Sequence, residues 1–114
     1  MLDCLFCKIF KKEIPAEVVY SDGNVLGFKD INPQAKTHLL FIHKTHSENI
    51  NHMVRLSSSQ LNQVFSAIEK YTNEKGIEDY GFRLVTNVGE KSGQSVFHTH
   101  VHLLSGEPLG RFGA

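Results

Sequence analysis

The chain has 114 residues, a length that suits one domain, and we expect residues 1–114 to form it without a second core. It carries 12 basic and 12 acidic side chains, so its formal charge is zero and no basic surplus indicates a nucleic-acid-binding surface. No run approaches the roughly 18 apolar residues that a membrane-spanning helix needs, which argues against a membrane protein.

The N-terminal stretch lacks a charged and apolar leader, so we expect a cytoplasmic protein, in which structural disulfides are rare. Cys4 and Cys7, the two cysteines of the chain, stand three residues apart. A redox pair of this spacing usually follows a strand in a βαβ pattern, which is missing here. We interpret the pair as half of a metal site, the alternative being two small buried side chains near a helix start. Residues 7–12 then predict a short helical turn, which ends before Pro15.

Three strands are predicted next. Residues 18–20 and 24–30 have strand character, and the Ser-Asp-Gly-Asn run between them contains residue types that adopt positive φ in tight turns. We therefore expect a hairpin. After a turn at residues 32–34, residues 38–43 form a nearly continuous apolar run, which is typical of a central strand buried on both faces.

One long helix is predicted to begin within residues 57–59, whose hydroxyl groups can cap it. Its apolar residues recur at helical spacing and should form the buried face: Leu61, Val64, Phe65, Ile68 and Tyr71. Gly76 suits a left-handed residue at the end of this helix. Ahead of the helix we interpret residues 47–51 as irregular and His52 as a surface side chain.

Strands over residues 82–87 and 97–104 complete the expected elements. Strands, then one long helix, then strands again indicate an α+β fold. We expect an antiparallel sheet of about five strands, with the long helix packed on one face and a short helix at the N-terminus.

The last of these strands carries His98, His100 and His102 at a strict period of two. Successive side chains of a strand point to opposite faces, so these three imidazoles would share one face. A polar outer face on an edge strand is the alternative. The glycine-rich residues 89–95 come directly before them and could hold an anion with backbone N–H groups, although a simple connecting loop would have a similar composition. Together they favour phosphoryl or nucleotidyl chemistry.

The run from His98 to Leu104 resembles the H-φ-H-φ-H-φ-φ signature of the histidine-triad (HIT) family, and residues 93–97 resemble its G-Q-S-V-[YF] segment. Residues 13–16, 28–35 and 37–40 also resemble, in order and spacing, segments of the Hint branch of nucleoside phosphoramidases. The resemblance covers nearly the whole chain. It implies the family's α+β fold and a homodimer in which two sheets join.

The resemblance also implies roles for the histidines. His100 would attack the α-phosphate of a purine nucleotide and form a covalent intermediate, which divides one difficult displacement into two easier steps. The carbonyl of His98 would hold the other ring nitrogen of His100, and His102 would donate to a phosphoryl oxygen. His38 is expected close to the triad, although taken alone it would be interpreted as a buried core histidine.

Further residues are implied to bind the substrate. The Ser95 hydroxyl would protonate the leaving amine, and N–H groups of Gly93, Gln94 and Ser95 would stabilise the transition state. The remaining candidates are Asp30 for the ribose hydroxyls, Phe28 and Ile31 for the base, and Asn87 near the phosphate and ribose. Asp30 as a turn cap and Asn87 as a loop residue are the alternatives.

Members of the family that carry C-x-x-C complete a zinc site with two histidines, here His46 and His98. A closed structural zinc site takes four sulfur or nitrogen ligands, and Cys4 with Cys7 supplies two of them. The resemblance therefore implies one structural zinc ion. His43 stands where relatives commonly have proline, and we assign it no role.

The expected function is hydrolysis of purine nucleoside phosphoramidates, that is, of AMP or GMP conjugates. A hydroxyl at Ser95 suits an amine leaving group, which favours this activity over the alternative of a dinucleoside polyphosphate hydrolase. A non-catalytic nucleotide-binding regulatory module is the alternative from a different class. A zinc metalloenzyme is disfavoured, because four strong ligands leave no position for water.

Overall fold

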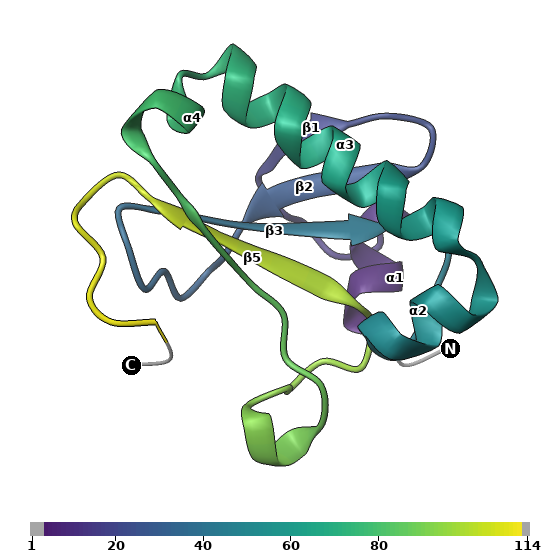
Figure 1. The fold of residues 1–114 in the computed structure, drawn as a ribbon. Helices are drawn as coiled ribbons and strands as arrows, with labels where there is room; N and C mark the ends of the chain where they lie inside the picture. Colours follow the sequence, from purple (N-terminus) through teal and green to yellow (C-terminus); the bar gives the residue numbers. More distant parts are fainter. Residues whose placement is uncertain (1–3, 113–114) are drawn as a thin grey trace.

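A five-stranded antiparallel sheet forms the centre of the computed structural model, which describes residues 4–112 (Figure 1). From one edge to the other the strands are β1 (Val18–Ser21), β2 (Val25–Lys29), β3 (Thr37–His43), β5 (His100–Ser105) and β4 (Arg83–Val85). β3 lies in the middle, between β2 and β5, and its residues from His38 onward are buried. The apolar run in this strand is explained by that position. The predicted α+β fold is confirmed.

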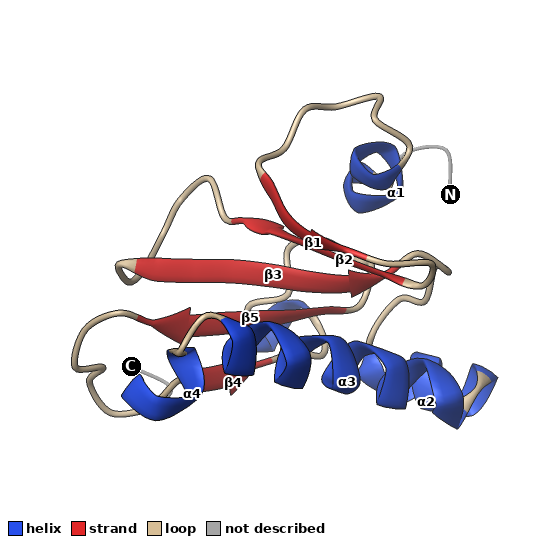
Figure 2. Cartoon of the chain, turned by 90° about the horizontal axis from the view of Figure 1, so that it is seen from above, coloured by secondary structure: helices blue, strands red, loops and turns tan. Residues whose placement is uncertain are grey.

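Helices cover both faces of the sheet, as Figure 2 shows edge-on. The long helix α3 (Ser58–Glu74) packs on one face, where Val64 and Ile68 belong to the same core as Phe41 and Leu103. The short helix α1 (Leu5–Phe10) packs on the other, where Phe6 joins the alternate residues of β2 and β3 in a second core. His100 and His102 pair with Ile42 and Leu40 across the sheet and therefore face α1.

The region before α3 differs from the expectation. Residues predicted as irregular contain the start of a further helix, α2 (Ile50–Leu56), on which His52 is half-buried. The Asn49 side chain caps this helix by accepting the backbone N–H of His52 at 3.0 Å. The Nδ1 atom of His52 accepts the N–H of Glu48 at 2.9 Å, so this imidazole has a structural partner.

The long helix itself agrees with the prediction apart from one side chain. Phe65 is 42% exposed instead of buried, since Val64, Ala67, Ile68 and Thr72 form the buried face of α3. Gly76 adopts φ 73° as predicted and leads into a short helix, α4 (Ile77–Tyr80). No helix within residues 4–112 combines the length and the hydropathy needed to cross a bilayer.

One turn and the start of one strand also differ from the prediction. Gly23 does not adopt a positive φ. The β1–β2 hairpin is instead closed by the Asp22 side chain, whose Oδ1 accepts the N–H groups of Asn24 and Val25 at 2.7 and 2.8 Å. At the other end of the chain, β5 begins only at His100, so His98 lies before the strand that was expected to contain it.

Candidate functional site

Four metal-ligating side chains meet beside α1, and we call them the Cys–His cluster: Cys4, Cys7, His46 and His98. Their ligand atoms all lie within 4.8 Å of one another. His98 Nδ1 is 3.2 Å from Cys4 Sγ, 3.4 Å from Cys7 Sγ and 3.2 Å from His46 Nδ1, and His46 Nδ1 is 3.5 Å from Cys7 Sγ. Ligand atoms of a tetrahedral zinc site are about 3.3 to 3.8 Å apart, given the usual Zn–S and Zn–N lengths. The spacing therefore fits a zinc ion.

The hydrogen bonds of His98 also suit a metal ligand. Its Nε2 donates to the carbonyl oxygen of His43 at 2.9 Å, so the proton of the neutral ring is on Nε2 and the Nδ1 lone pair faces the cluster. Burial, together with neighbouring imidazoles, lowers the pKa of His98 to about 4, which keeps the ring neutral at pH 7. A backbone carbonyl that accepts the other ring N–H is a usual partner of a metal-bound imidazole.

The two thiols reach this cluster through the start of α1. Cys4 caps the helix, since its Sγ accepts the backbone N–H of Cys7 at 3.3 Å. Burial and the neighbouring Cys4 raise the pKa of Cys7 to about 11. A coordinated divalent cation removes such a thiol proton outright. Two thiols and two neutral imidazoles therefore form a set of four ligands that suits a zinc ion.

Two further imidazoles, which we call the His38–His102 pair, lie along the same face of the sheet, and here His38 turns its N–H, not its lone pair, toward the neighbouring side chain. The backbone N–H of Gln34 donates to His38 Nδ1 at 2.9 Å, which leaves the ring proton of neutral His38 on Nε2. That N–H donates to His102 Nδ1 at 2.9 Å, so the proton of His102 is on its own Nε2. Burial lowers the pKa of His38, and burial with the neighbouring His100 and His38 lowers that of His102 to about 4.

Asp30 stands beside this pair, with Oδ2 3.4 Å from His38 Nε2. Asp30, His38 and His102 thus bring three ligand atoms within 4.8 Å of one another, as the Cys–His cluster does. A metal would need a lone pair on His38 Nε2, but the Gln34 N–H already occupies the other nitrogen and keeps the proton on Nε2. This geometry favours proton donation over metal binding.

His100 lies between these two groups of side chains. Its Nδ1–H donates to the carbonyl oxygen of His98 at 2.7 Å, as expected for an imidazole whose Nε2 attacks. The Phe6 ring packs edge-on against it with centroids 5.0 Å apart. Burial lowers the pKa of His100, although the bond to His98 opposes this shift. The ring therefore offers a neutral, oriented Nε2 lone pair.

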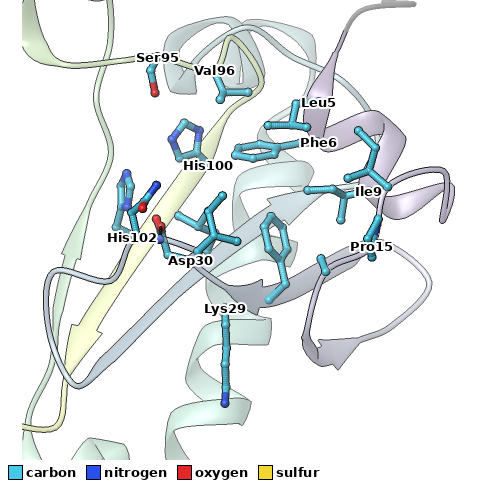
Figure 3. A pocket seen from close by; sticks show the side chains of 16 residues that line it. Leu5, Phe6, Ile9, Pro15, Lys29, Asp30, Ser95, Val96, His100 and His102 are labelled. Carbon is cyan, nitrogen blue, oxygen red and sulfur yellow. Dashed lines mark hydrogen bonds between the residues drawn. The ribbon is translucent and has the colours of Figure 1, made fainter.

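A pocket of about 270 Å³ opens in front of His100 and His102 (Figure 3). Its polar end also contains Ser95 and Asp30, with Val96 beside Ser95, and the opposite wall is apolar, with Leu5, Phe6, Ile9 and Pro15. Phe28 lines it from β2 and is buried, whereas Ile31 stands at the rim and is 90% exposed.

The two carboxylate oxygens of Asp30 have different surroundings. Its Oδ1 accepts the backbone N–H of Asn32 at 2.8 Å, so the residue is a turn cap, the alternative that the sequence left open. Its Oδ2 is not used by the turn and lies on the pocket side near His38. The carboxylate can therefore cap the turn and face a ligand at once.

The glycine-rich loop differs from the expectation of three free N–H donors. The N–H of Gly93 donates to Glu90 O at 3.0 Å and that of Gln94 to Gly89 O at 3.1 Å, so both are consumed inside the loop. The Gln94 side chain is buried and anchors the loop to the carbonyl of Glu48 at 2.6 Å. In this structure the N–H groups of Gly93 and Gln94 are therefore engaged inside the loop, and Ser95 is the residue of this loop segment that lines the pocket.

Two further residues from the sequence analysis, Asn87 and His43, lie outside the pocket lining. Asn87 is half-buried beside the loop, with Nδ2 3.8 Å from the point where a Cβ on Gly93 would lie, and it is not among the residues that line the pocket. His43 is buried and structural: its Nδ1 accepts the Thr45 N–H at 2.9 Å, and its Nε2 donates to Gln63 Oε1 at 2.7 Å.

Sequence reasoning missed the groups that fix the imidazole protons. The Gln34 N–H and the His43 carbonyl are backbone atoms, for which side-chain patterns contain no signal. Phe6 was visible as an apolar residue between the two cysteines, and its contact with His100 could have been expected only once α1 was placed on this face.

Comparisons of the sequence and of the structure with known proteins point to the same family. The HIT domain family model matches residues 11–109. The protein is 41% identical to Protein HitA of Neisseria gonorrhoeae, over 96% of this chain and 100% of that one, and 38% identical to the purine nucleoside phosphoramidase of Escherichia coli K12, over 95% and 91%. The crystal structure of a HIT family hydrolase from Legionella pneumophila superposes with a TM-score of 0.92, at 44% identity, covering 98% of this chain and 100% of that one.

Proposed function

The chain belongs to the HIT domain family, and on this basis we propose that it is a nucleotide-binding hydrolase that cleaves the phosphorus–nitrogen bond of purine nucleoside phosphoramidates. The observation that carries the proposal is the orientation of His100. Its Nδ1–H is held by the His98 carbonyl at 2.7 Å, and the ring lines the pocket. A neutral, oriented imidazole is a good nucleophile toward an electrophilic phosphorus.

In the first step the Nε2 of His100 attacks the α-phosphorus in line with the leaving amine. The phosphorus–Nε2 bond forms as the phosphorus–amine bond breaks, and the Ser95 hydroxyl gives its proton to the amine. Charge grows on the phosphoryl oxygens, and the Nε2–H of His102 is directed to donate to one of them. In the second step water displaces His100, releases the nucleoside monophosphate and returns a proton to Ser95.

The pocket suggests how the nucleotide would lie. The Oδ2 of Asp30 would accept hydrogen bonds from the ribose hydroxyls, and the apolar wall near Phe28 and Ile31 would receive the purine base. Asn87 would contribute beside the phosphate from the loop that it supports. The mixture of one apolar wall and a few convergent polar groups is typical of small-molecule sites.

We also propose that Cys4, Cys7, His46 and His98 hold one zinc ion. The ion would supply structural cross-linking between the N-terminal segment and the segment that precedes β5, and it would orient His98. Its four ligands would leave no open position, so it takes no part in the hydrolysis. A cytoplasmic location agrees with the two free thiols, because a reducing compartment preserves them.

A homodimer in which two sheets join is the proposed assembly, with residues 1–114 forming one HIT domain. β4 is an edge strand of the described sheet, and the groove between it and α3 is lined by exposed Phe65 and Phe82. An unpaired edge flanked by aromatic side chains is suited to a second copy of the chain.

The test is a panel of adenosine and guanosine phosphoramidates and dinucleoside polyphosphates, assayed with the wild type and with His100→Ala. We expect turnover of the phosphoramidates, a nucleotidyl adduct on His100 by mass spectrometry and no turnover by His100→Ala. His52→Ala, which removes an imidazole outside the pocket, is the matched control. Faster cleavage of the polyphosphates would favour the alternative hydrolase, and tight nucleotide binding without turnover would favour the regulatory module.

A further inference from the structure

The peptide group between His98 and Thr99 is hydrogen-bonded at both ends. Its carbonyl oxygen accepts the Nδ1–H of His100 at 2.7 Å, and its N–H donates to the carbonyl of Ser47 at 2.8 Å. These two groups belong to one planar unit, so a rotation that disturbs one also turns the other. The direction in which His100 points therefore depends on how firmly this peptide is held.

The side chains of Ser47 and Thr99 add to that hold. Their hydroxyl oxygens are 2.6 Å apart, and Thr99 Oγ1 also donates to the Ser47 carbonyl at 3.2 Å. Thr99 therefore bonds the same carbonyl twice, through its N–H and its hydroxyl, and the Ser47 hydroxyl completes the set. Ser47 is 0% and Thr99 3% exposed, so solvent does not compete for these bonds.

We infer that Ser47 and Thr99 are positioning residues for the nucleophile: they fix the peptide whose carbonyl holds the Nδ1–H of His100. The inference rests on the proposed function, in which His100 attacks phosphorus. Neither residue lines the pocket, so they act through the peptide and not on the substrate. The bonds from His100 through the peptide to Ser47 point in one direction, and such chains strengthen each member.

The same residues explain why two distant segments stay together. Ser47 follows His46 and Thr99 follows His98, and the hydroxyl contact joins positions 52 residues apart. Ser47 and Thr99 thus hold these two chain segments together next to the Cys–His cluster. The hydroxyl bonds do this with protein atoms alone, independently of any bound ion.

The first test compares three single variants. Thr99→Val has nearly the same shape without the hydroxyl, and we expect kcat to fall roughly 10- to 100-fold with KM within about twofold, because misdirection of a bound nucleophile slows chemistry more than binding. Thr99→Ser keeps the hydroxyl and should recover most of kcat. Thr72→Val is the matched control, since Thr72 is also buried and donates to the Ile68 carbonyl at 2.8 Å inside α3, away from the pocket.

A double variant separates positioning from stability. Thr99→Val leaves the buried Ser47 hydroxyl without its partner and should lower Tm. Ser47→Ala with Thr99→Val removes both hydroxyls, so Tm should partly recover while kcat stays low. A kcat of Thr99→Val equal to that of the wild type would overturn the inference, and so would a kcat that recovers together with Tm in the double variant.

An NMR measurement without substrate distinguishes this inference from the proposed function. The ¹⁵N shifts of His100 in the wild type should report a proton on Nδ1, and Thr99→Val should mix in the other tautomer. A spectrum unchanged by Thr99→Val would overturn the positioning role even in an active enzyme. Loss of the Nδ1–H signature in that variant would support the role even if the wild type hydrolysed no phosphoramidate.

Discussion

The Cys–His cluster and the His38–His102 pair lie on either side of His100, and both contain histidines. In the cluster a ring turns its lone pair toward the neighbouring side chains, whereas in the pair a ring turns its N–H toward them. In the cluster, the His43 carbonyl takes the ring proton of His98 outward and leaves a lone pair inside. In the pair, the Gln34 N–H occupies the outer nitrogen of His38 and leaves an N–H inside. One backbone atom thus decides whether an imidazole can bind a cation or donate a proton.

The largest expected effect comes from removing the thiols. Cys4→Ser with Cys7→Ser should abolish bound zinc, measured by elemental analysis, and lower Tm by at least roughly 10 °C, because metal binding stabilises only the folded chain. Residual phosphoramidase activity should remain, since His100 is not a ligand. Unchanged metal content would show that the ion lies elsewhere and would contradict the assignment of the Cys–His cluster as the metal site.

The second-largest effect is expected in the His38–His102 pair. His38→Phe leaves His102 Nδ1 without its donor, so kcat should fall on the order of 10²-fold, as for loss of a positioned proton donor. Zinc content should not change, which separates the two groups of imidazoles. His38→Gln, whose amide can still donate, should recover part of kcat. A His38→Phe variant with wild-type kcat would show that the pair is only structural.

A smaller effect is expected at Asp30. The wild type should bind adenosine monophosphate more tightly than its 2′,3′-dideoxy analogue by roughly 1 to 3 kcal/mol, measured by calorimetry, because the analogue leaves an acceptor unpaired. Asp30→Asn keeps an oxygen for the Asn32 N–H and should reduce this difference while Tm stays near that of the wild type. Equal affinity of the wild type for both ligands would leave Asp30 only its role as a turn cap.

The last prediction concerns the pH dependence of stability. His98 and His102 have pKa values of about 4 in the folded protein, below the ordinary value of about 6.5 that they regain on unfolding. The unfolded chain binds more protons between these values, so the resulting stability is complete above about pH 6.5 and is lost as the pH falls toward 4. With metal chelated, the urea midpoint should therefore be lower at pH 5 than at pH 7. His102→Asn should show a shallower fall, and an identical one would contradict the assignment.

Features set by neighbouring residues could be predicted from the sequence, and features set by distant contacts could not. The apolar run of β3 and the spacing of Val64 and Ile68 on α3 reflect local periodicity. Phe65 fits the same helical period but lies at the border of the buried face, where packing decides the outcome. Helix α2 was missed although Asn49, a favoured capping residue, stands directly before it.

The candidate site shows the same division. The short spacing of Cys4 and Cys7 indicated a shared role, but their meeting with His46 and His98 could be expected only from the family resemblance, because no local pattern encodes contacts over such distances. The glycine-rich loop suggested free N–H donors. Whether an N–H in a loop is free depends on the turn that the loop adopts, and the turn here consumes those of Gly93 and Gln94.

The contact between Cys4 and His98 spans 94 residues, and this separation has a consequence for biosynthesis. Cys4 is synthesised early, whereas His98 follows it by 94 residues and the strand β5, which completes the pairing of β3, is made later still. A four-ligand site cannot assemble on the nascent chain before that point. Metal capture would therefore mark chains whose synthesis has passed residue 98, and truncated products would be left with two unshielded thiols and a sheet without its central partner strand.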